Sequence, residues 1–434
     1  MKYIILSLGC AKNLVDSERF VAILKNYGLT EADEWKDADL ILVNTCAFLH
    51  AALTELDDTL TAILQEIGKA PTKLVVTGCV MNRGLKTFQE KFPRVDSWIS
   101  LKDLAAFENY LKSSVLPKGA DISRKRLLSR APLEQEQHVY LRIADGCENH
   151  CTYCLIPSIR GKLVSVPIEE LVEEAKALVK RGKELVLIAQ DSCMYGTDIY
   201  GRKALPELIE ALHKIKGFEW IRLMYLHPDH FELSWLPLWS KYPKLLPYFE
   251  IPIQHVSDGI IHAMNRQKGY AELKALFAAI KAGVPKAVFR TTLMLGYPGE
   301  IQEDRDLIDK FLTEVDIMHV GVFGYSPETK GSEWHYPEAW DWDAVRELEL
   351  ELESKLEEQK TAKMEQLVGT IHRGMIVDYS PEMEALCARL WFQAPEIDGI
   401  VYLENRPVDD KLMVDIEITD ALGDELWGIV TEED

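Results

Sequence analysis

The chain has 434 residues, of which 47% are hydrophobic and 27% are charged, a composition typical of a globular protein with two or three domains. No apolar run approaches the length needed to cross a bilayer, and eight cysteines in so long a chain exclude a small disulfide scaffold. The formal net charge of −21 repels nucleic acid unless a local basic patch opposes it, and it attracts basic proteins.

The first region, residues 1–118, repeats one local pattern three times. A short apolar run, typical of a buried parallel strand, ends in small polar residues and a cysteine. The three runs are KYIILSLGC, DLILVNTC and KLVVTGC, and helical patterns separate them. This alternation predicts a three-layer α/β domain whose strand ends bring Cys10, Cys46 and Cys79 to one edge. Because the first run lacks the basic lead-in of a signal peptide, we expect a cytoplasmic protein.

Residues 119–132 are polar and basic, with prolines nearby, and predict a linker. In the next region, 133–368, helical patterns separate most of six strand candidates: VYLRIADG, ELVLIAQD, WIRLMYLHP, YFEIPIQH, VFRTTLMLGYP and IMHVGVFGYSP. This order predicts a partial (β/α)6 barrel, with its site at the carboxyl ends of the strands. From Asp341 onward the region is charged and free of proline, which favours a long connecting helix.

The last region, 369–434, is expected to be all-β. Val414, Ile416 and Ile418 alternate with polar residues, the period of a half-buried strand. Its size fits a small antiparallel β-barrel. The predicted fold class is therefore α/β, with a three-layer N-terminal domain, a partial barrel in the centre and a small β-barrel at the end.

The strongest chemical pattern is the C-x3-C-x2-C run of Cys147, Cys151 and Cys154 at the end of the first barrel strand. A 4Fe–4S cluster normally takes four thiolates, so three leave one iron open to bind a small molecule. The alternative, a zinc knuckle, usually needs two separated pairs of ligands, and no second pair follows here. The spacing therefore predicts an iron–sulfur cluster with an open iron.

Five other features are weaker. Cys10, Cys46 and Cys79 suggest a second three-cysteine cluster, although single cysteines are more often core residues. Cys193 and Cys387 stand apart, and we interpret them as buried thiols. Past the fifth barrel strand, Gly296 and Gly299 flank Pro298, a pattern that suits either a turn or a close approach to a ligand. The Gly182-Lys183-Glu184 element precedes the second barrel strand. One interpretation is that a polar group of this element faces the barrel mouth.

Taken together, these motifs resemble those of the radical S-adenosylmethionine (SAM) methylthiotransferases. Tyr153 before the last cysteine matches the radical SAM signature, and the contexts LGCAKNLVDSE, NTCAF and TGC match the N-terminal domain of that family. The C-terminal region looks like its TRAM domain. Of two branches, one modifies a transfer-RNA adenosine and the other an aspartate of small-subunit ribosomal protein twelve. The chain resembles the second branch in SLGCAKNLVDSE, CLIPSIRGKLVS, ELVLIAQDS, IPIQHVSD, FGYSPE and APEIDGIVYL.

The resemblance implies two 4Fe–4S clusters and SAM as cofactors. Cys147, Cys151 and Cys154 are implied to hold the radical cluster, and Cys10, Cys46 and Cys79 an auxiliary cluster that carries the sulfur. The implied SAM contacts are Tyr153 beside the adenine, Glu184 near the methionine amine, and Arg290 and Gly296 at the adenosyl part. The chain departs from the family where Gly-Gly-Glu reads Gly-Lys-Glu, and at Cys193, where the family usually has a hydroxylated residue.

The resemblance also implies the reaction. An unactivated C–H bond next to a carboxylate is beyond acid–base catalysis, so a cofactor-derived radical is needed. The implied partners are ribosomal protein twelve, free or in the ribosome, and an electron donor such as flavodoxin or ferredoxin, with no membrane. From Thr370 onward the chain has 16 Asp or Glu and four Lys or Arg, so nucleic acid is not the expected direct substrate. The alternatives are methylthiolation of a transfer-RNA adenosine and a non-catalytic iron–sulfur carrier.

Overall fold

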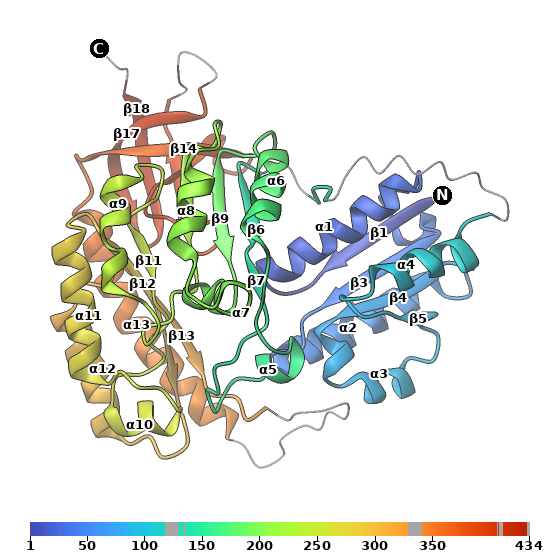
Figure 1. Cartoon of the computed structure of the whole chain (residues 1–434), viewed down its shortest axis with the longest axis horizontal. Coiled ribbons are helices and arrows are strands. Elements are labelled where there is room, and N and C mark those ends of the chain that lie inside the picture. Colours follow the sequence, from blue (N-terminus) through green and yellow to red (C-terminus); the bar gives the residue numbers. More distant parts are fainter. Residues whose placement is uncertain (118–129, 134–135, 329–340, 406, 408–410, 432–434) are drawn as a thin grey trace.

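The computed structural model of the chain describes residues 1–117, 130–133, 136–328, 341–405, 407 and 411–431 (Figure 1). Most of the predicted linker, 119–132, lies outside the described residues. Within the described part, no helix is both long enough and apolar enough to span a membrane.

The N-terminal domain is built on a five-stranded parallel sheet in the order β2-β1-β3-β4-β5. Its strands are β1 (Lys2–Ser7), β2 (Thr30–Glu31), β3 (Leu40–Thr45), β4 (Lys73–Gly78) and β5 (Ser97–Trp98). The three predicted strands are β1, β3 and β4, which lie next to one another in the sheet. All six residues of β3 are buried, which agrees with the apolar run of its first four residues.

Helices cover both faces of this sheet. On one face lie α1 (Ala11–Asn26) and α4 (Leu104–Tyr110), which pack Phe20 and Phe107 edge to face. On the other face lie α2 (His50–Ile67) and α3 (Leu85–Lys91), which share a core with Ile41 and Val43. The three-layer α/β prediction is confirmed.

The central domain is the predicted incomplete barrel. Its parallel strands form two sheets, β10-β9-β6 and β11-β12-β13, which an isolated bridge between Ile221 and Leu245 connects. The strands are β6 (His138–Arg142), β9 (Glu184–Ile188), β10 (Trp220–Leu223), β11 (Tyr248–Glu250), β12 (Val288–Leu295) and β13 (His319–Gly324). All six correspond to the predicted strands, and β6 and β13 are the outer strands of the described set.

Helices and short elements connect the barrel strands. They are β7 (Ala144–Asp145), α5 (Ile156–Ile159), β8 (Val164–Ser165), α6 (Ile168–Leu178), α7 (Thr197–Tyr200), α8 (Leu205–His213), α9 (Pro237–Lys241), α10 (Asp258–Ala263), α11 (Tyr270–Gly283) and α12 (Gln302–Glu314). The apolar faces of the longer helices pack on the outside of the barrel in one large core. A long helix, α13 (Trp342–Glu365), then follows where the connecting helix was predicted.

The N-terminal domain reaches both outer strands of the barrel (Figure 1). On the β6 side, Asp16 of α1 accepts a hydrogen bond from Arg142 at 2.6 Å. On the β13 side, Glu328 pairs with Arg83 and accepts a hydrogen bond from the backbone of His50 at 2.9 Å. The domain therefore closes the side of the barrel that the six strands leave open.

The C-terminal domain is a closed five-stranded barrel in the order β14-β15-β16-β18-β17. The strands are β14 (Ile371–Ser380), β15 (Ala385–Leu390), β16 (Ile400–Leu403), β17 (Met413–Leu422) and β18 (Glu425–Thr431). Val414, Ile416 and Ile418 point into its core, as their alternation predicts. The prediction of a purely antiparallel barrel needs one correction, because β16 and β18 pair in parallel. β18 takes that direction because it pairs antiparallel with β17, the strand that comes between β16 and β18 in the chain.

Candidate active site

The first cysteine site, which we call the loop site, consists of Cys147, Cys151 and Cys154. Its loop leaves the carboxyl end of β6 and turns at Gly146, which has a φ of +77°. A Cβ atom at Gly146 would collide with the backbone oxygen of Lys162. The backbone of Cys147 then donates a hydrogen bond to Gly161 at 3.0 Å, which closes the loop. The three thiols therefore gather in a loop whose entry only glycine tolerates.

Residues that follow other barrel strands hold this loop. Asn149 donates a hydrogen bond to Asp191, after β9, at 2.9 Å. The backbone of Thr152 donates to Met264 at 3.2 Å, and its hydroxyl lies 2.7 Å from that of Tyr297, after β12. The loop site therefore lies at the carboxyl end of the barrel, as predicted.

The thiols of the loop site are partly buried. Burial raises the pKa of Cys147 to about 11, and it raises that of Cys154 to about 12. The charge of the Cys151 thiolate also raises the pKa of Cys147 and that of Cys154. Three thiolates side by side thus need a positive partner, and a metal cluster supplies one and releases protons as it binds.

The second site, which we call the edge site, consists of Cys10, Cys46 and Cys79. Cys46 and Cys79 directly follow β3 and β4, and Cys10 lies three residues after the adjacent strand β1, so the predicted convergence is confirmed. Two glycines let the three segments that carry these cysteines approach one another. A Cβ at Gly9 would lie 2.6 Å from that of Cys46, and one at Gly78 would collide with the backbone of Thr45.

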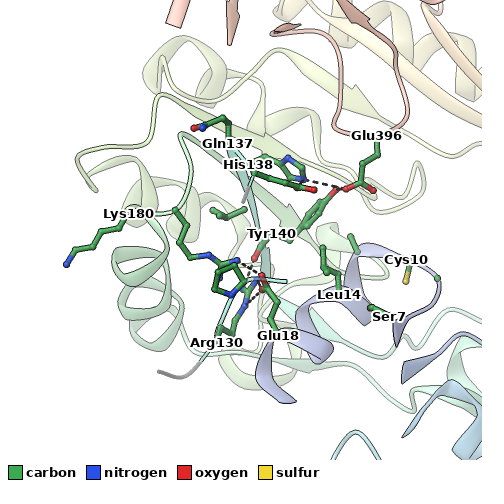
Figure 2. Close-up of a pocket in the computed structure, with 16 residues that line it drawn as sticks. Ser7, Cys10, Leu14, Glu18, Arg130, Gln137, His138, Tyr140, Lys180 and Glu396 are labelled. Carbon is green, nitrogen blue, oxygen red and sulfur yellow. Dashed lines mark hydrogen bonds and ion pairs between the residues drawn. The ribbon is translucent and has the colours of Figure 1, made fainter. Parts of the chain in front are cut away.

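The three cysteines of the edge site differ in their exposure to solvent. Cys10 is exposed, Cys46 is half-buried and Cys79 is buried. Burial raises the pKa of Cys79 to about 12, while the charge of Arg160 acts in the opposite direction. A cavity of about 590 Å³ lies along the Cys10 side, between α1, β6 and the C-terminal domain (Figure 2). The edge site therefore presents its most exposed thiol, Cys10, to this cavity.

The predicted SAM contacts separate into two groups. Tyr153 lies within the loop site, where burial raises the pKa of its hydroxyl and the Arg266 guanidinium lowers it. Gly296 lies at the carboxyl end of β12, with a φ of +73°, and packs against Val345 of α13. The neighbouring Tyr297 contacts the loop site. Tyr153 and Gly296 therefore lie at the end of the barrel where SAM was predicted to bind.

Glu184 does not lie there, which corrects the prediction for this residue. It is the first residue of β9, at the amino end of the barrel, in register with His138 at the start of β6. Its fully buried carboxylate pairs with Arg222 at 2.6 Å and with Arg389 of the C-terminal domain at 2.5 Å. Glu184 therefore connects two domains instead of meeting SAM.

Arg290 needs the same correction. It lies in the first half of β12, in register with Glu250 and His319, and pairs with Asp398 of the C-terminal domain. The hydroxyl of Tyr248 donates a second hydrogen bond to Asp398 at 2.6 Å. With Glu184, these contacts fill the amino end of the barrel with a buried ionic network that docks the C-terminal domain.

The structure adds polar residues near the loop site that the sequence did not single out. A cavity of about 600 Å³ is lined by Cys151, His227, His230 and Arg266. Asp191 accepts a hydrogen bond from Asn149 and lies 2.6 Å from Nδ1 of His230. Asp191, His227 and His230 each follow the carboxyl end of a barrel strand. This position along the chain is the sequence signal that could have identified them.

His227 has a fixed protonation pattern in this cavity. Its Nδ1 accepts a hydrogen bond from the backbone of Asp229 at 3.2 Å, so a neutral ring carries its proton on Nε2. Burial, followed by the charge of Arg266, lowers its pKa to about 3. The ring is therefore neutral at physiological pH.

Models of known families match three consecutive parts of the chain. Residues 2–100 match the "Uncharacterized protein family UPF0004", residues 141–312 the radical SAM superfamily, and residues 368–430 the TRAM domain. These stretches correspond to the sheet domain with the edge site, the barrel with the loop site, and the small β-barrel.

Curated relatives match over the whole chain. The ribosomal protein uS12 methylthiotransferase RimO of Thermotoga sp. (strain RQ2) is 34% identical, over 98% of this chain and 98% of the relative. The RimO of Desulfotalea psychrophila is 36% identical over 100% of both chains. That of Clostridium tetani is 34% identical over 100% of this chain and 99% of the relative. The chain belongs to the RimO methylthiotransferase family.

A solved structure supports the fold of this RimO-family chain. The apo form of the cobalamin-dependent SAM radical enzyme OxsB is similar with a TM-score of 0.51 and 11% identity. The likeness covers 82% of this chain, which spans a little over half of that structure at 56%. At this identity the likeness concerns the fold alone.

The residues of the loop site fit the cofactors of a radical SAM enzyme of the RimO family, which are SAM and an iron–sulfur cluster. Three thiols gather in one loop, and a polar cavity of about 600 Å³ borders Cys151. Three thiolates leave one position of a 4Fe–4S cluster open. Cys193 and Cys387 are buried, as the sequence predicted.

Proposed function

We propose that this chain transfers a methylthio group to the β-carbon of an aspartate in ribosomal protein uS12. In this proposal, the loop site holds the radical 4Fe–4S cluster and the edge site holds an auxiliary 4Fe–4S cluster. The observation that carries the proposal is the joining of the two sites. The N-terminal domain closes the open side of the barrel, and the segment after Cys154 contacts both sites through Arg160 and Gly161.

The two sites suit different tasks. When bound, the radical cluster and SAM supply the one-electron chemistry that removes a hydrogen atom from an unactivated C–H bond. The residues of the chain fix the position of that chemistry through the tethers of Asn149 and Thr152. The edge site, with one exposed cysteine, suits the exchange of sulfur with a donor.

The charge of the C-terminal domain supports a basic protein as the substrate. From Thr370 onward the chain contains 16 acidic and four basic residues. Arg389 is buried against Glu184, and Arg373 pairs with Asp415 at 3.3 Å. Of the two others, only Lys411 is described, and it is exposed. A domain that binds RNA phosphates should instead offer several free cations, so the charge favours uS12 over transfer RNA.

The proposal also includes the setting of the enzyme. The radical cluster needs an electron from a small donor protein such as flavodoxin or ferredoxin, and such donors and ribosomes occur together in the cytoplasm. We propose that the chain acts there, on uS12 alone or in the ribosome.

The experiment that tests this function is done without oxygen. The protein is reconstituted with iron and sulfide, given a reductant and SAM, and offered a uS12 loop peptide and a transfer-RNA anticodon stem in parallel. Mass spectrometry is expected to find the methylthio group on the aspartate of the peptide. A methylthio group on the RNA alone would assign the chain to the other substrate. Absence of SAM cleavage would leave an iron–sulfur carrier.

A further inference from the structure

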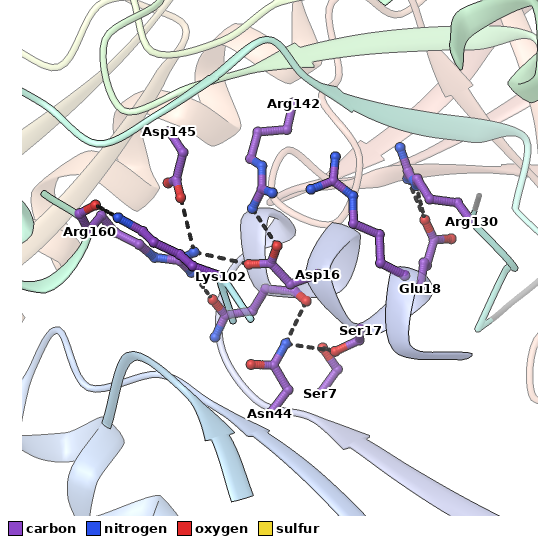
Figure 3. Close-up of polar contacts among 12 residues, drawn as sticks. Ser7, Asp16, Ser17, Glu18, Asn44, Lys102, Arg130, Arg142, Asp145 and Arg160 are labelled. Carbon is purple, nitrogen blue, oxygen red and sulfur yellow. Dashed lines mark hydrogen bonds and ion pairs between the residues drawn. The ribbon is translucent and has the colours of Figure 1, made fainter. Parts of the chain in front are cut away.

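Arg160 lies where the N-terminal domain meets the barrel, and Figure 3 shows it between Asp16 of α1 and Asp145 of the barrel. It follows the short helix α5, which begins two residues after Cys154. Its side chain is 6% exposed, although it carries a full charge. A buried arginine needs several partners to offset its lost hydration, and those of Arg160 come from both sites.

On the side of the edge site, the guanidinium contacts the first turns of α1, the helix that begins directly after Cys10. It donates a hydrogen bond to Oδ1 of Asn13 at 2.5 Å and another to Oδ2 of Asp16 at 3.0 Å. Asn13 in turn donates to the backbone oxygens of Leu8 and Thr45, both at 2.9 Å. Arg160 is therefore connected to the strand ends that carry Cys10 and Cys46.

The helix α5, which ends just before Arg160, packs against the strand end that carries the third thiol of the edge site. Ile159 and Cys79 share one apolar core, and Asn82 donates a hydrogen bond to the backbone oxygen of Ile159 at 2.7 Å. Among the charges that raise the pKa of Arg160 against the effect of burial, that of Cys79 is the largest, ahead of those of Asp145 and Asp16. Arg160 thus provides a buried positive charge next to a thiol that becomes a thiolate on metal binding.

On the side of the loop site, the backbone carries the connection. Gly161, the next residue, accepts the hydrogen bond from Cys147 at 3.0 Å. The guanidinium lies 3.6 Å from Asp145, two residues before Cys147. Lys102 of the N-terminal domain donates to the backbone oxygen of Arg160 at 2.8 Å. A displacement of Arg160 therefore moves both sites.

We propose that Arg160 is a positioning residue that fixes the distance between the auxiliary cluster and the radical cluster and supplies positive charge beside Cys79. This inference rests on the proposed function. Arginine suits the task because its planar guanidinium reaches several acceptors at fixed angles, whereas lysine is a single point of charge. A positive charge near a cluster stabilises its reduced form and raises its reduction potential.

The test compares three variants with the unchanged chain. Arg160→Gln removes the charge, and Arg160→Lys keeps the charge but not the multiple contacts. Arg130→Gln is the matched control, because Arg130 is also a buried arginine that joins α1 to the central domain, through Glu18 and Glu174. No hydrogen bond or ion pair to a cysteine is found for Arg130 among the described residues.

Two readouts separate positioning from simple stability. The first is the reduction potential of the auxiliary cluster, measured by electron paramagnetic resonance in chains whose loop-site cysteines are alanine. The second, in chains with both sites intact, is the ratio of methylthio product to deoxyadenosine. Arg160→Gln is expected to make the potential more negative and lower the ratio at least tenfold. Arg160→Lys should keep the potential near that of the parent while still lowering the ratio.

The outcomes are distinguishable. Both Arg160 variants could match Arg130→Gln in the reduction potential and in the ratio of methylthio product to deoxyadenosine. That result would overturn the role of Arg160 and leave the proposed function intact. If Arg160→Gln does not fold, an unchanged product ratio in Arg160→Lys would likewise overturn the role of Arg160. Absence of iron from the edge site of the parent chain would overturn the auxiliary cluster itself, and this inference with it.

Discussion

The loop site and the edge site each contain three cysteines but are assembled in different ways. The loop site takes its thiols from eight consecutive residues, and backbone hydrogen bonds close the loop. The edge site takes them from three strands that alternate with helices along the N-terminal domain. It therefore exists only when the sheet has formed. The comparison teaches that one ligand set is encoded locally, while the other depends on burial of β1, β3 and β4.

The largest expected effect separates the sites by function. Cys151→Ala should abolish deoxyadenosine formation, because the loop site then lacks a ligand. Cys46→Ala should keep SAM cleavage but abolish methylthio transfer. Liquid chromatography of the reaction products measures both. Methylthio transfer by Cys46→Ala at the rate of the unchanged chain would contradict a role of the edge site in sulfur insertion.

The next prediction uses the glycine at each site. Gly146 has a φ of +77° and Gly78 a φ of +108°, and a Cβ at either position would collide with backbone. We expect Gly146→Ala to remove iron from the loop site and Gly78→Ala to remove it from the edge site. Iron and sulfide analysis of the two variants measures the loss. Gly201→Ala is the control, since Gly201 also has a positive φ but has open space around it. Equal iron loss in all three would refute the local effect.

A third prediction concerns the amino end of the barrel, away from both sites. Glu184→Gln leaves Arg222 and Arg389 without their buried counter-charge, which should destabilise the fold by about 3–5 kcal/mol. Both sites should still take up iron below the unfolding temperature. Thermal unfolding and iron analysis test these expectations. A loss of SAM binding in a folded, iron-loaded variant would restore Glu184 to the site.

The same carboxylate gives a pH dependence. Burial alone raises the pKa of Glu184, but Arg222 and Arg389 bring it down to about 2 from an ordinary value of 4.5. Because the folded pKa is the lower one, this stabilisation is present above about pH 4.5 and is lost as the pH falls towards 2. In Glu184→Gln, that part of the acid sensitivity should be absent, as denaturant titrations at several pH values would show.

The smallest expected effect concerns the tethers of the loop site. Asp191 accepts hydrogen bonds from Asn149 and from the backbone of Cys193 at 3.0 Å. Asp191→Asn weakens these charge-assisted bonds and should slow SAM cleavage about tenfold, or by about 1.4 kcal/mol. The edge site has no contact with Asp191 among the described residues, so its iron content should not change. An equal loss of iron from both sites would show general misfolding instead.

The sequence by itself determined the order of strands and helices, the three parts of the chain and the local loop of Cys147, Cys151 and Cys154. These follow from hydrophobic periodicity and short spacing, which act between near neighbours. It also indicated the edge site, because a parallel sheet aligns the ends of its strands. The strand candidate ELVLIAQD begins at Glu184, so chain direction already placed this residue at the amino end, and its SAM role rested on the resemblance alone. Glu184 and Arg290 were assigned to SAM, yet both lie towards the amino end, opposite the loop site.

Only the tertiary structure decided what these charged residues contact. The carboxylate of Glu184 and the guanidinium of Arg290 find partners in the C-terminal domain, far away in the sequence. In the same way, Arg160 acquires its role from Asn13 and Asp16, in another domain. A buried charge is stable only next to an opposite charge or a hydrogen-bonding group. Its partner is therefore set by the packing of whole domains and not by the residues around it in the chain.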